Sequence, residues 1–228
     1  IRDRNTLNER QDWLCQAVES YLAQQSVDLQ LIVSTVVGDA SLRTLKNYPE
    51  VELCLNDKPD IYAQLNKACE LVSSPWFSYA ASDDVVLPTR FWDEINICLK
   101  TGSKICSSAF HKTDDQLNIT STFCGPDRYL LPHHLQKNFV SDCSLMHRDI
   151  LQEFGPFDLA MDNMAHWDFW LRVGTRDPEL ITLSPTPTWL YRQHHNSRHA
   201  QRVGDQFKIA KRELARMKMM RKHATTLG

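Results

Sequence analysis

The sequence lacks the glycine-rich signatures of the common nucleotide-binding and hydrolase sites. Its 228 residues contain no G-x-G-x-x-G, no Walker loop and no G-x-S-x-G, so dinucleotide-binding, P-loop and serine-hydrolase sites have no support. Its seven cysteines are spread along the chain without a C-x-x-C pair, which argues against a structural zinc site or a disulfide framework. We therefore expect buried, reduced thiols in a cytoplasmic protein.

The sequence also lacks an excess of charge and a long apolar run. The formal net charge is −2 with a pI near 6.5, which argues against a surface that binds nucleic acid. No segment approaches the length of a membrane span, and no signal peptide is evident. The sequence opens on Ile1-Arg2 without a methionine. If residues precede it in the natural protein, a first strand would be cut short.

What the sequence does contain is an alternation of helical and strand patterns over its first hundred residues. Helical spacing over 10–25, with Asn8 as its cap, is followed by a continuous apolar run over 29–37. The pattern continues with a helix over 42–47, a strand over 51–55, a helix over 60–72, a strand over 76–81, and a helix from Pro88 whose core face holds Phe91, Ile95 and Leu99. This order predicts an α/β fold with a mostly parallel central sheet flanked by helices, in which the 29–37 strand is covered on both faces.

The second half of the sequence is less regular. We expect strands over 104–110, 139–146, 180–183 and 189–192, helices over 148–154 and 166–173, and a polar loop over 111–138. A final helix over 206–223 carries an apolar stripe of Phe207, Ala210, Leu214 and Met217 among seven basic residues. Such a helix either packs its stripe and leaves its charges in water, or touches an anionic membrane surface.

Asp83 and Asp84 follow the apolar 76–81 strand, at the edge where ligands bind on such sheets. Two adjacent carboxylates repel each other unless something neutralises them. A divalent cation such as Mg²⁺ or Mn²⁺ takes carboxylate oxygens together with phosphate oxygens, and so supplies a reason for the pair. The alternative is that Asp83 caps the next helix and Asp84 is solvated.

Two histidine-bearing segments are further candidates. His194 follows the last predicted strand, and a neutral imidazole completes a metal shell begun by carboxylates; a solvated loop is the alternative. His166 and Asp168 begin an aromatic helix, where either side chain suits removal of a proton from an acceptor hydroxyl. Asp168 also lies four residues before Arg172, so a purely structural ion pair is the alternative.

Seven segments, taken in order, resemble the inverting family-2 glycosyltransferases, which have the GT-A fold. The matching segments are 14–25, Leu31-Ile32-Val33, 61–68, Ser82-Asp83-Asp84-Val85-Val86-Leu87-Pro88, Phe154-Gly155-Pro156-Phe157-Asp158, 167–173 and Tyr191-Arg192-Gln193-His194. The resemblance implies a GT-A domain over residues 1–199, with 200–228 as a basic amphipathic C-terminal helix.

The resemblance also implies roles for individual residues. Asp83 matches the last aspartate of the family's D-x-D motif, which holds the metal that bridges the donor diphosphate, and His194 matches a histidine that adds a metal contact. The positions implied for contacts to the donor are Arg2, Asp3, Arg4, Asn5, Asp39, Asp57, Asp60, Ser82 and Asp84.

This sequence departs from the family at three motifs. The aspartate that usually follows the second strand is replaced by the stretch Ser34-Thr35-Val36-Val37, with Asp39 further on. Ala81 stands where the first aspartate of D-x-D is expected, so the motif is one carboxylate short. The family's E-D-W-D is Ala165-His166-Trp167-Asp168 here, so the usual position of the base is His166. We expect Asp168 to act as base or acceptor contact, with His166 as the rival.

The function implied by the resemblance is a metal-assisted, inverting glycosyltransferase. It would move one hexosyl or deoxyhexosyl group from a nucleotide diphosphate-sugar, most commonly a UDP-sugar, to a glycan or lipid hydroxyl, with Mn²⁺ or Mg²⁺ as cofactor. We expect no nucleic acid partner and a cytoplasmic location, with peripheral membrane contact through the C-terminal helix. The missing carboxylate leaves open a degenerate member that binds nucleotide-sugar or glycan without turnover. A nucleotidyltransferase has less support, because Asp3-Arg4-Asn5-Thr6-Leu7 contains no glycine-rich loop.

Overall fold

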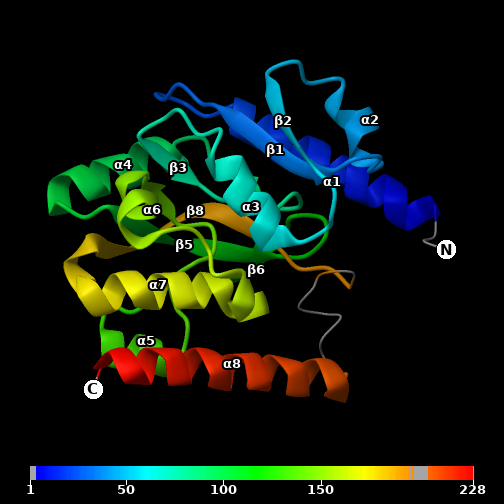
Figure 1. Ribbon diagram of the computed structural model, residues 1–228. Coiled ribbons are helices and arrows are strands. Elements are labelled where there is room, and N and C mark those ends of the chain that lie inside the picture. Colours follow the sequence, from blue (N-terminus) through cyan, green and yellow to red (C-terminus); the bar gives the residue numbers. More distant parts are fainter. Residues whose placement is uncertain (1–3, 196, 198–204, 228) are drawn as a thin grey trace.

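Helices and strands alternate through the first hundred residues, as the sequence predicts (Figure 1). The computed structural model describes residues 4–195, 197 and 205–227, without the side chains of 4–8 and 225–227. The elements of this half are α1 (Arg4–Leu22), β1 (Leu31–Val36), α2 (Ser41–Leu45), β2 (Val51–Asn56), α3 (Ile61–Cys69), β3 (Trp76–Ser78), β4 (Val85–Val86) and α4 (Arg90–Thr101). Asn8 lies inside α1 and is not its cap, which corrects the predicted start of this helix.

The second half departs further from expectation. Its elements are β5 (Ile105–Thr113), β6 (Ile119–Phe123), α5 (Leu131–Gln136), β7 (Leu145–His147), α6 (Asp149–Phe154), the 3-10 helix η1 (Leu159–Met164), α7 (Ala165–Arg176), the 3-10 turn η2 (Pro178–Leu180), β8 (Ile181–Arg192) and α8 (Gln206–Leu227). The predicted loop over 111–138 contains β6 and α5, and the two predicted strands after 180 are one strand, β8. The predicted strand over 139–146 is reduced to β7, because Ser141 accepts a hydrogen bond from the Ser144 amide and forms a turn instead.

The strands form two sheets, and the larger one is mixed. β1 and β2 pair in parallel, with Leu31 opposite Val51. The other strands run in the order β3-β7-β5-β8-β4, and β6 pairs with residues 110–113 of β5. Of the six strand pairs in the described residues, only β1–β2 and β5–β8 are parallel. The prediction of one mostly parallel sheet is therefore wrong. β6, for example, follows β5 through a tight turn and pairs antiparallel with it. Such a connection needs no crossover helix.

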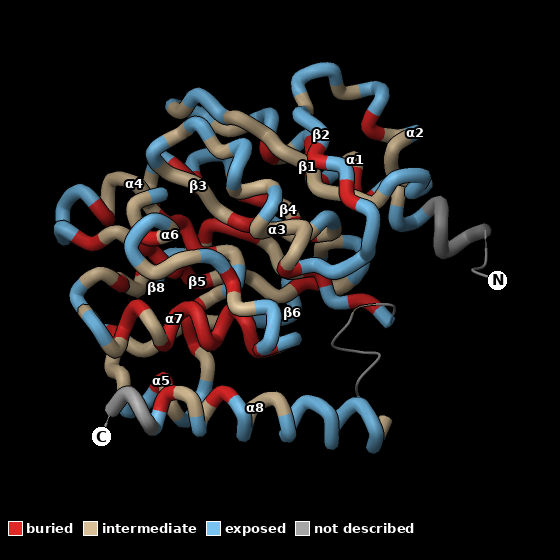
Figure 2. The backbone as a smooth tube through the Cα atoms, in the orientation of Figure 1, coloured by how far each residue is buried: buried red, intermediate tan, exposed pale blue. Residues whose placement is uncertain are grey.

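The hydrophobic core lies between the larger sheet and α7. Every residue from Ala165 to Leu171 is buried (Figure 2), and Phe169, Trp170 and Leu171 are fully inaccessible. Such complete burial is typical of a helix that is enclosed on several sides. α7 contacts α5, α6 and α8, so it forms the centre of this half of the molecule.

A buried ion pair attaches α4 to the larger sheet. Glu94 Oε1 accepts hydrogen bonds from Arg90 Nε at 3.1 Å, Ser108 Oγ at 2.6 Å and Thr188 Oγ1 at 2.7 Å. Three donors on one carboxylate oxygen offset much of the cost of burying its charge. Leu99, in contrast, is 67% exposed, so its predicted place on the core face of α4 is wrong.

α8 packs on the protein through a different face from the predicted one. Met219 and His223 are buried, whereas the side chains from Gln206 to Leu214 are all exposed (Figure 2). The predicted stripe therefore faces solvent, with Phe207 80% exposed. Polar contacts set this rotation of the helix, because His223 and Lys222 both bind Asp168 of α7.

Two smaller expectations concern thiols and membrane spans. All seven cysteines are free thiols, but only Cys54, Cys98 and Cys106 are buried and Cys124 is exposed, so the predicted burial is correct for three of them. Within the described part of the chain, no helix is both long enough and apolar enough to cross a membrane.

Candidate functional site

Asp83 and His194 lie side by side at the end of the larger sheet. β4 pairs antiparallel with β8, Val85 opposite Leu190, so the residues just before β4 meet those just after β8. Asp83 Oδ2 lies 3.0 Å from His194 Nε2. The Asp83 side chain is one-third exposed, and that of His194 is almost fully covered. The pair that the sequence predicts as metal ligands is thus brought together by the fold.

The geometry of this pair fits two neighbouring ligands of a divalent cation. Ligands bonded at about 2.1 Å in an octahedral shell lie about 3 Å apart along its edges, which is the observed separation. The Trp13 ring packs against the His194 imidazole, with 4.4 Å between ring centroids, and so holds its orientation. Among the described residues no group of three such side chains is found. The remaining ligands would be phosphate oxygens and water, as is usual for Mg²⁺.

Asp84 and Arg192 form the buried support beneath this pair. Asp84 Oδ1 accepts a hydrogen bond from the Arg192 amide at 2.9 Å, and Arg192 Nε donates to the Asp83 carbonyl at 2.8 Å. Burial, followed by the charge of Asp83, raises the pKa of Asp84 to about 8. Asp84 is 3% exposed, so its side chain points into the protein and away from any ligand.

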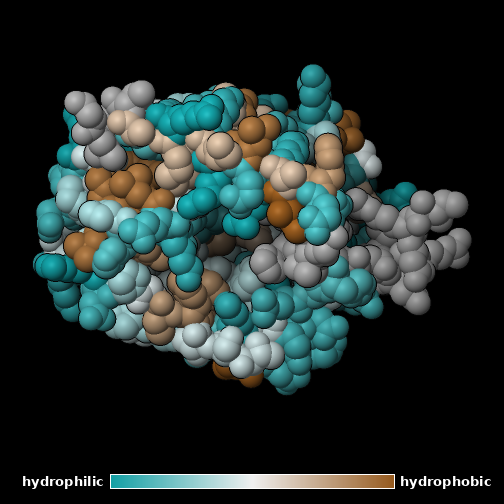
Figure 3. Space-filling view, turned by 90° about the horizontal axis from the view of Figure 1, so that it is seen from below, coloured by the Kyte–Doolittle hydropathy of each residue, from teal (hydrophilic) through white to brown (hydrophobic). Residues whose placement is uncertain are grey.

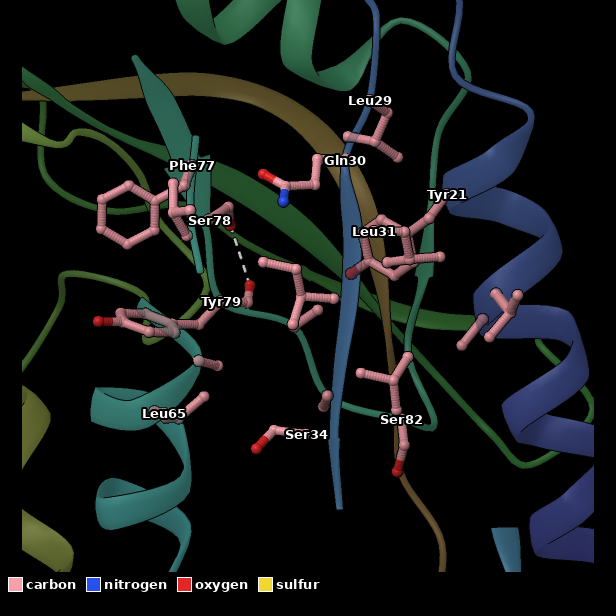
Figure 4. Close-up of a pocket in the computed structure, with 18 of the residues that line it drawn as sticks. Tyr21, Leu29, Gln30, Leu31, Ser34, Leu65, Phe77, Ser78, Tyr79 and Ser82 are labelled. Carbon is pink, nitrogen blue, oxygen red and sulfur yellow. Dashed lines mark hydrogen bonds between the residues drawn. The ribbon is translucent and has the colours of Figure 1, made fainter. Parts of the chain in front are cut away.

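A cavity of about 1020 Å³ opens at the same edge of the sheet. Ser82 and Asp83 line it, together with Ser34 of β1 and Gln64 of α3. Figure 4 shows Ser34 and Ser82 at one end of this space. The volume lies at the upper end of the range for small-molecule sites, so the cavity is large enough for a nucleotide-sugar.

Three of the implied donor contacts follow the ends of β1 and β2, and all are exposed. Asp39 accepts a hydrogen bond from the Ser41 amide, and Asp60 caps α3 by accepting from the Tyr62 and Ala63 amides. Because β1 and β2 are parallel, Asp39 and Asp57 lie at the same edge. Arg2 and Asp3 lie outside the described residues, and Arg4 and Asn5 lie in α1 without described side chains.

Asp168 occupies a structural position. It is fully buried and binds His223 at 2.9 Å, Lys222 at 2.9 Å and Arg172 at 3.1 Å. Burial pushes the pKa of Asp168 upward, but the hydrogen bonds from His223 and Lys222 outweigh it and leave the pKa below its ordinary value. An acceptor hydroxyl cannot reach this carboxylate, so the geometry does not suit a catalytic base.

His166, the rival candidate, lies beside a carboxylate that sequence reasoning missed. Its Nδ1 is 3.6 Å from Oδ2 of Asp142, and its ring contacts the edges of Tyr62, Tyr79 and Phe157. The Asp142 side chain is 59% exposed. No motif marks Asp142, because the sequence pattern around it indicates only the predicted strand over 139–146.

Three carboxylates of this region raise the pKa of one tyrosine, Tyr191. Burial raises the pKa of Tyr191, and the negative charges of Asp84, Asp83 and Asp142 raise it further. Asp142 therefore belongs to the same electrostatic environment as Asp83. Sequence reasoning also gave Arg192 no role, although the segment containing it was part of the family resemblance.

No protein-family model matches the chain, and no curated protein matches it in sequence. Solved structures of S. aureus TarS share its fold at 11% identity. TarS 1–349 in complex with UDP-GlcNAc gives a TM-score of 0.66 over 85% of this chain and 58% of that one, and its complex with UDP gives 0.62 over 82% and 58%. A further TarS structure gives 0.63 over 82% of this chain and 35% of its own. The chain thus spans between a third and three-fifths of these structures, and the likeness supports a glycosyltransferase-type fold.

Proposed function

We propose that this chain is a glycosyltransferase that moves a single sugar from a UDP-sugar to a hydroxyl of an acceptor glycan or lipid, with inversion. The observation that carries this proposal is the Asp83–His194 pair, whose Asp83 lines a large cavity. The fold around the pair is shared with structures that hold UDP and UDP-GlcNAc. The finer assignment, to the inverting family-2 glycosyltransferases, rests on the sequence motifs.

Asp83 Oδ2 and His194 Nε2 would hold Mn²⁺ or Mg²⁺ together with the donor diphosphate. When bound, such a cation stabilises the negative charge of the departing nucleotide diphosphate. Arg192 keeps Asp83 in place through the backbone carbonyl, and Trp13 keeps His194 in place through its ring. Preorganisation of this kind costs nothing at the moment of reaction.

Asp142 is our candidate for the base that activates the acceptor. The acceptor oxygen bonds to the anomeric carbon as the bond from that carbon to the diphosphate oxygen breaks on the opposite face. The hydroxyl proton passes to the Asp142 carboxylate, whose Oδ2 lies 3.6 Å from His166 Nδ1. Asp142 takes over the role expected of Asp168, because Asp142 is exposed and Asp168 is buried against Arg172, Lys222 and His223.

The experiment that tests the proposal is hydrolysis of UDP-sugars with and without Mn²⁺. We expect Asp83→Ala and His194→Ala each to lower the Mn²⁺-dependent rate by about a hundredfold, the loss typical for removal of one group that stabilises transition-state charge. Asp127→Ala, at an exposed aspartate, is the matched control and should keep the rate. A rate that is unchanged in Asp83→Ala would overturn the assignment.

A protein that binds the donor without turnover is the second candidate function. Ala81 removes one carboxylate of the D-x-D motif, and Asp83 and His194 have no third candidate ligand beside them among the described residues. Such a protein would bind UDP with Mn²⁺ in a calorimeter but show no hydrolysis or transfer with any common donor.

The C-terminal helix supports a lipid-linked acceptor and peripheral contact with a membrane. Phe207, Leu214 and Met217 are 80%, 68% and 51% exposed, and they lie among basic residues of α8. Figure 3 views the molecule from the side on which α8 lies, where hydrophobic patches interrupt a largely hydrophilic surface. An exposed apolar stripe flanked by cations suits an anionic membrane surface.

A further inference from the structure

A tight turn over residues 141–144 contains Asp142, the candidate base. The Ser144 amide donates to the Ser141 carbonyl at 3.2 Å, and the Cys143 amide donates to Ser141 Oγ at 3.1 Å. These bonds use the backbone of the turn, whereas the Asp142 side chain is 59% exposed. The segment, which we call the Asp142 turn, therefore leaves one carboxylate accessible while its backbone is bonded inward.

Ser107 of β5 holds the start of the Asp142 turn. Within the described residues, β5 pairs with β7 only through Ile105 and Cys106. At the next position a side chain replaces the ladder, because Ser107 Oγ accepts a hydrogen bond from the Ser141 amide at 2.9 Å. Ser107 is only 5% exposed. A hydrogen bond in such a buried position is strengthened by the low local dielectric, so it fixes the turn relative to the sheet.

Two further side chains hold the end of the turn. Ser78 Oγ of β3 donates to the Cys143 carbonyl at 2.8 Å, and Nη2 of Arg90 in α4 donates to the same carbonyl. Arg90 is 1% exposed, and Glu94 balances its charge. A buried guanidinium needs partners for its N–H groups. Arg90 finds one of them on the residue next to Asp142.

The backbone sets the place of the Asp142 carboxylate more than any side-chain contact does. Its Oδ2 lies 3.6 Å from His166 Nδ1, which is longer than a hydrogen bond. Three polar groups from α4, β3 and β5 nevertheless converge on four residues of turn. Most turns leave their polar backbone groups to water, so this support calls for a reason of its own.

We propose that Ser107, Ser78 and Arg90 are positioning residues for sugar transfer, which hold the Asp142 turn so that its carboxylate stays at the acceptor hydroxyl. This inference rests on the proposed function and on Asp142 as the base. A base must lie within hydrogen-bond reach of the proton that it removes. A displacement of about 1 Å at such a group costs about a hundredfold in rate, which gives the buried support its reason.

Ser107 is the best of the three for substitution. Arg90 also balances the charge of Glu94, so its removal would leave an unpaired buried charge. Ser78 also lines the large cavity, so a change there would affect the donor as well. Ser107→Ala removes one hydroxyl and one hydrogen bond to the Asp142 turn.

The kinetics of donor hydrolysis test the proposal, with water in place of the acceptor hydroxyl. The probe is the fastest substrate among UDP-GlcNAc, UDP-glucose and UDP-galactose, with Mn²⁺ present. We expect Asp142→Asn to lower kcat by about a hundredfold and Ser107→Ala to lower it by at least about tenfold. The KM for the donor should stay the same in both variants, because neither residue is assigned to the donor.

Ser184→Ala is the matched control. Ser184 of β8 is also 5% exposed, and its Oγ also accepts a hydrogen bond from a backbone amide, that of Thr186 at 3.3 Å. The substitution therefore removes the same group and the same kind of bond away from the Asp142 turn. Its kcat should match that of the unchanged protein, and a loss equal to that of Ser107→Ala would overturn the proposal.

A double variant separates positioning from general damage. If Ser107 acts through Asp142, Ser107→Ala should cost nothing further once Asp142 has been replaced. Asp142→Asn combined with Ser107→Ala should then have the kcat of Asp142→Asn alone. A purely structural role would multiply the two losses, and multiplied losses would contradict the positioning role.

Hydrogen exchange gives a readout that needs no turnover. The Ser141 amide should exchange at least about tenfold faster in Ser107→Ala, since its partner is lost, and at the original rate in Ser184→Ala. Unchanged exchange in both would overturn the role of Ser107 at any level of activity.

The outcomes also separate this inference from the proposed function. A loss of rate in Asp142→Asn without a loss in Ser107→Ala would overturn the positioning role alone. A full rate in Asp142→Asn would overturn the choice of base and the positioning role together. No hydrolysis of any of the three donors by the unchanged protein would overturn the proposed function, and this inference with it.

Discussion

At the scale of single residues, burial separates three carboxylates that look alike in the sequence. Asp83 is one-third exposed and faces His194. Asp84 is buried against a backbone amide, and Asp168 is buried against Arg172, Lys222 and His223. Of the three, only Asp83 is both exposed to solvent and next to a second candidate metal ligand, as a site for a donor diphosphate would require.

The role of Asp168 can be tested through stability. We expect Asp168→Asn to lower the free energy of unfolding by about 3 kcal/mol, because it removes the buried negative charge that binds Arg172 and Lys222. The rate of sugar transfer per folded molecule should stay near that of the unchanged protein. Urea unfolding and a transfer assay measure the two effects, and a large loss of rate with normal stability would restore Asp168 as a catalytic residue.

His134 makes stability depend on pH. It is fully buried between the Tyr129 hydroxyl and Asn138 Oδ1, and burial lowers its pKa to about 4. Because an unfolded histidine titrates near 6.5, the folded state binds fewer protons between these values. Stability present above pH 6.5 is therefore lost as the pH falls towards 4, by roughly 3 kcal/mol.

Urea unfolding at pH 7, 5.5 and 4.5 checks this expectation. His134→Gln should reduce the loss between pH 7 and 4.5, although it lowers stability at pH 7. His133→Gln, the exposed neighbour in α5, should keep the full pH dependence. Identical slopes in the two variants would contradict the assignment to His134.

At the scale of elements, pairing between β4 and β8 creates the site. β4 has only two residues, yet its register with Leu190 and Trp189 brings Asp83 beside His194. In α8, by contrast, the packing leaves apolar side chains exposed. Only its second half packs, through Met219 and His223, so the apolar stripe of the first half remains on the surface.

The exposed stripe of α8 predicts binding to anionic vesicles. We expect the protein to sediment with phosphatidylserine vesicles and only weakly with phosphatidylcholine, and salt to weaken the binding. Replacing Phe207 and Leu214 by Ser should lower the vesicle-bound fraction by about fivefold or more, since each buried side chain contributes 1.5–3 kcal/mol. Leu99→Ser, at an exposed leucine on α4, is the control. Binding that is equal for both lipids would remove the membrane role.

At the scale of the whole molecule, a bound donor nucleotide should stabilise the fold. With UDP at about a hundred times its dissociation constant and Mn²⁺ present, the stabilisation is about 2.7 kcal/mol, or about 5 °C or more in Tm for a chain of this size. Thermal unfolding measures this shift. Asp83→Ala should abolish it, and a larger shift with GDP than with UDP would contradict the choice of base.

The motifs of the first half led to the right elements, and the resemblance singled out two residues, Asp83 and His194, that the fold brings together. Helical spacing, the apolar run of β1 and the acidic segment after the predicted 76–81 strand are local features. Local patterns of this kind predict local structure. The resemblance then paired Asp83 with His194 across 111 positions of the chain. Strand direction was predicted wrongly, because the alternation of helix and strand does not report whether a strand returns through a hairpin or a crossover.

The sequence by itself determined the kind of fold, the helices and strands of the first hundred residues, and the candidate pair Asp83 and His194. Only the tertiary structure decided that Asp168 is enclosed while Asp142 is open, that the stripe of α8 faces water, and that the strands form two sheets. Burial and strand pairing depend on residues far apart in the chain, and so no window of sequence contains them. The same reason explains why Asp142, which has no motif around it, became a candidate only once the fold set it beside His166.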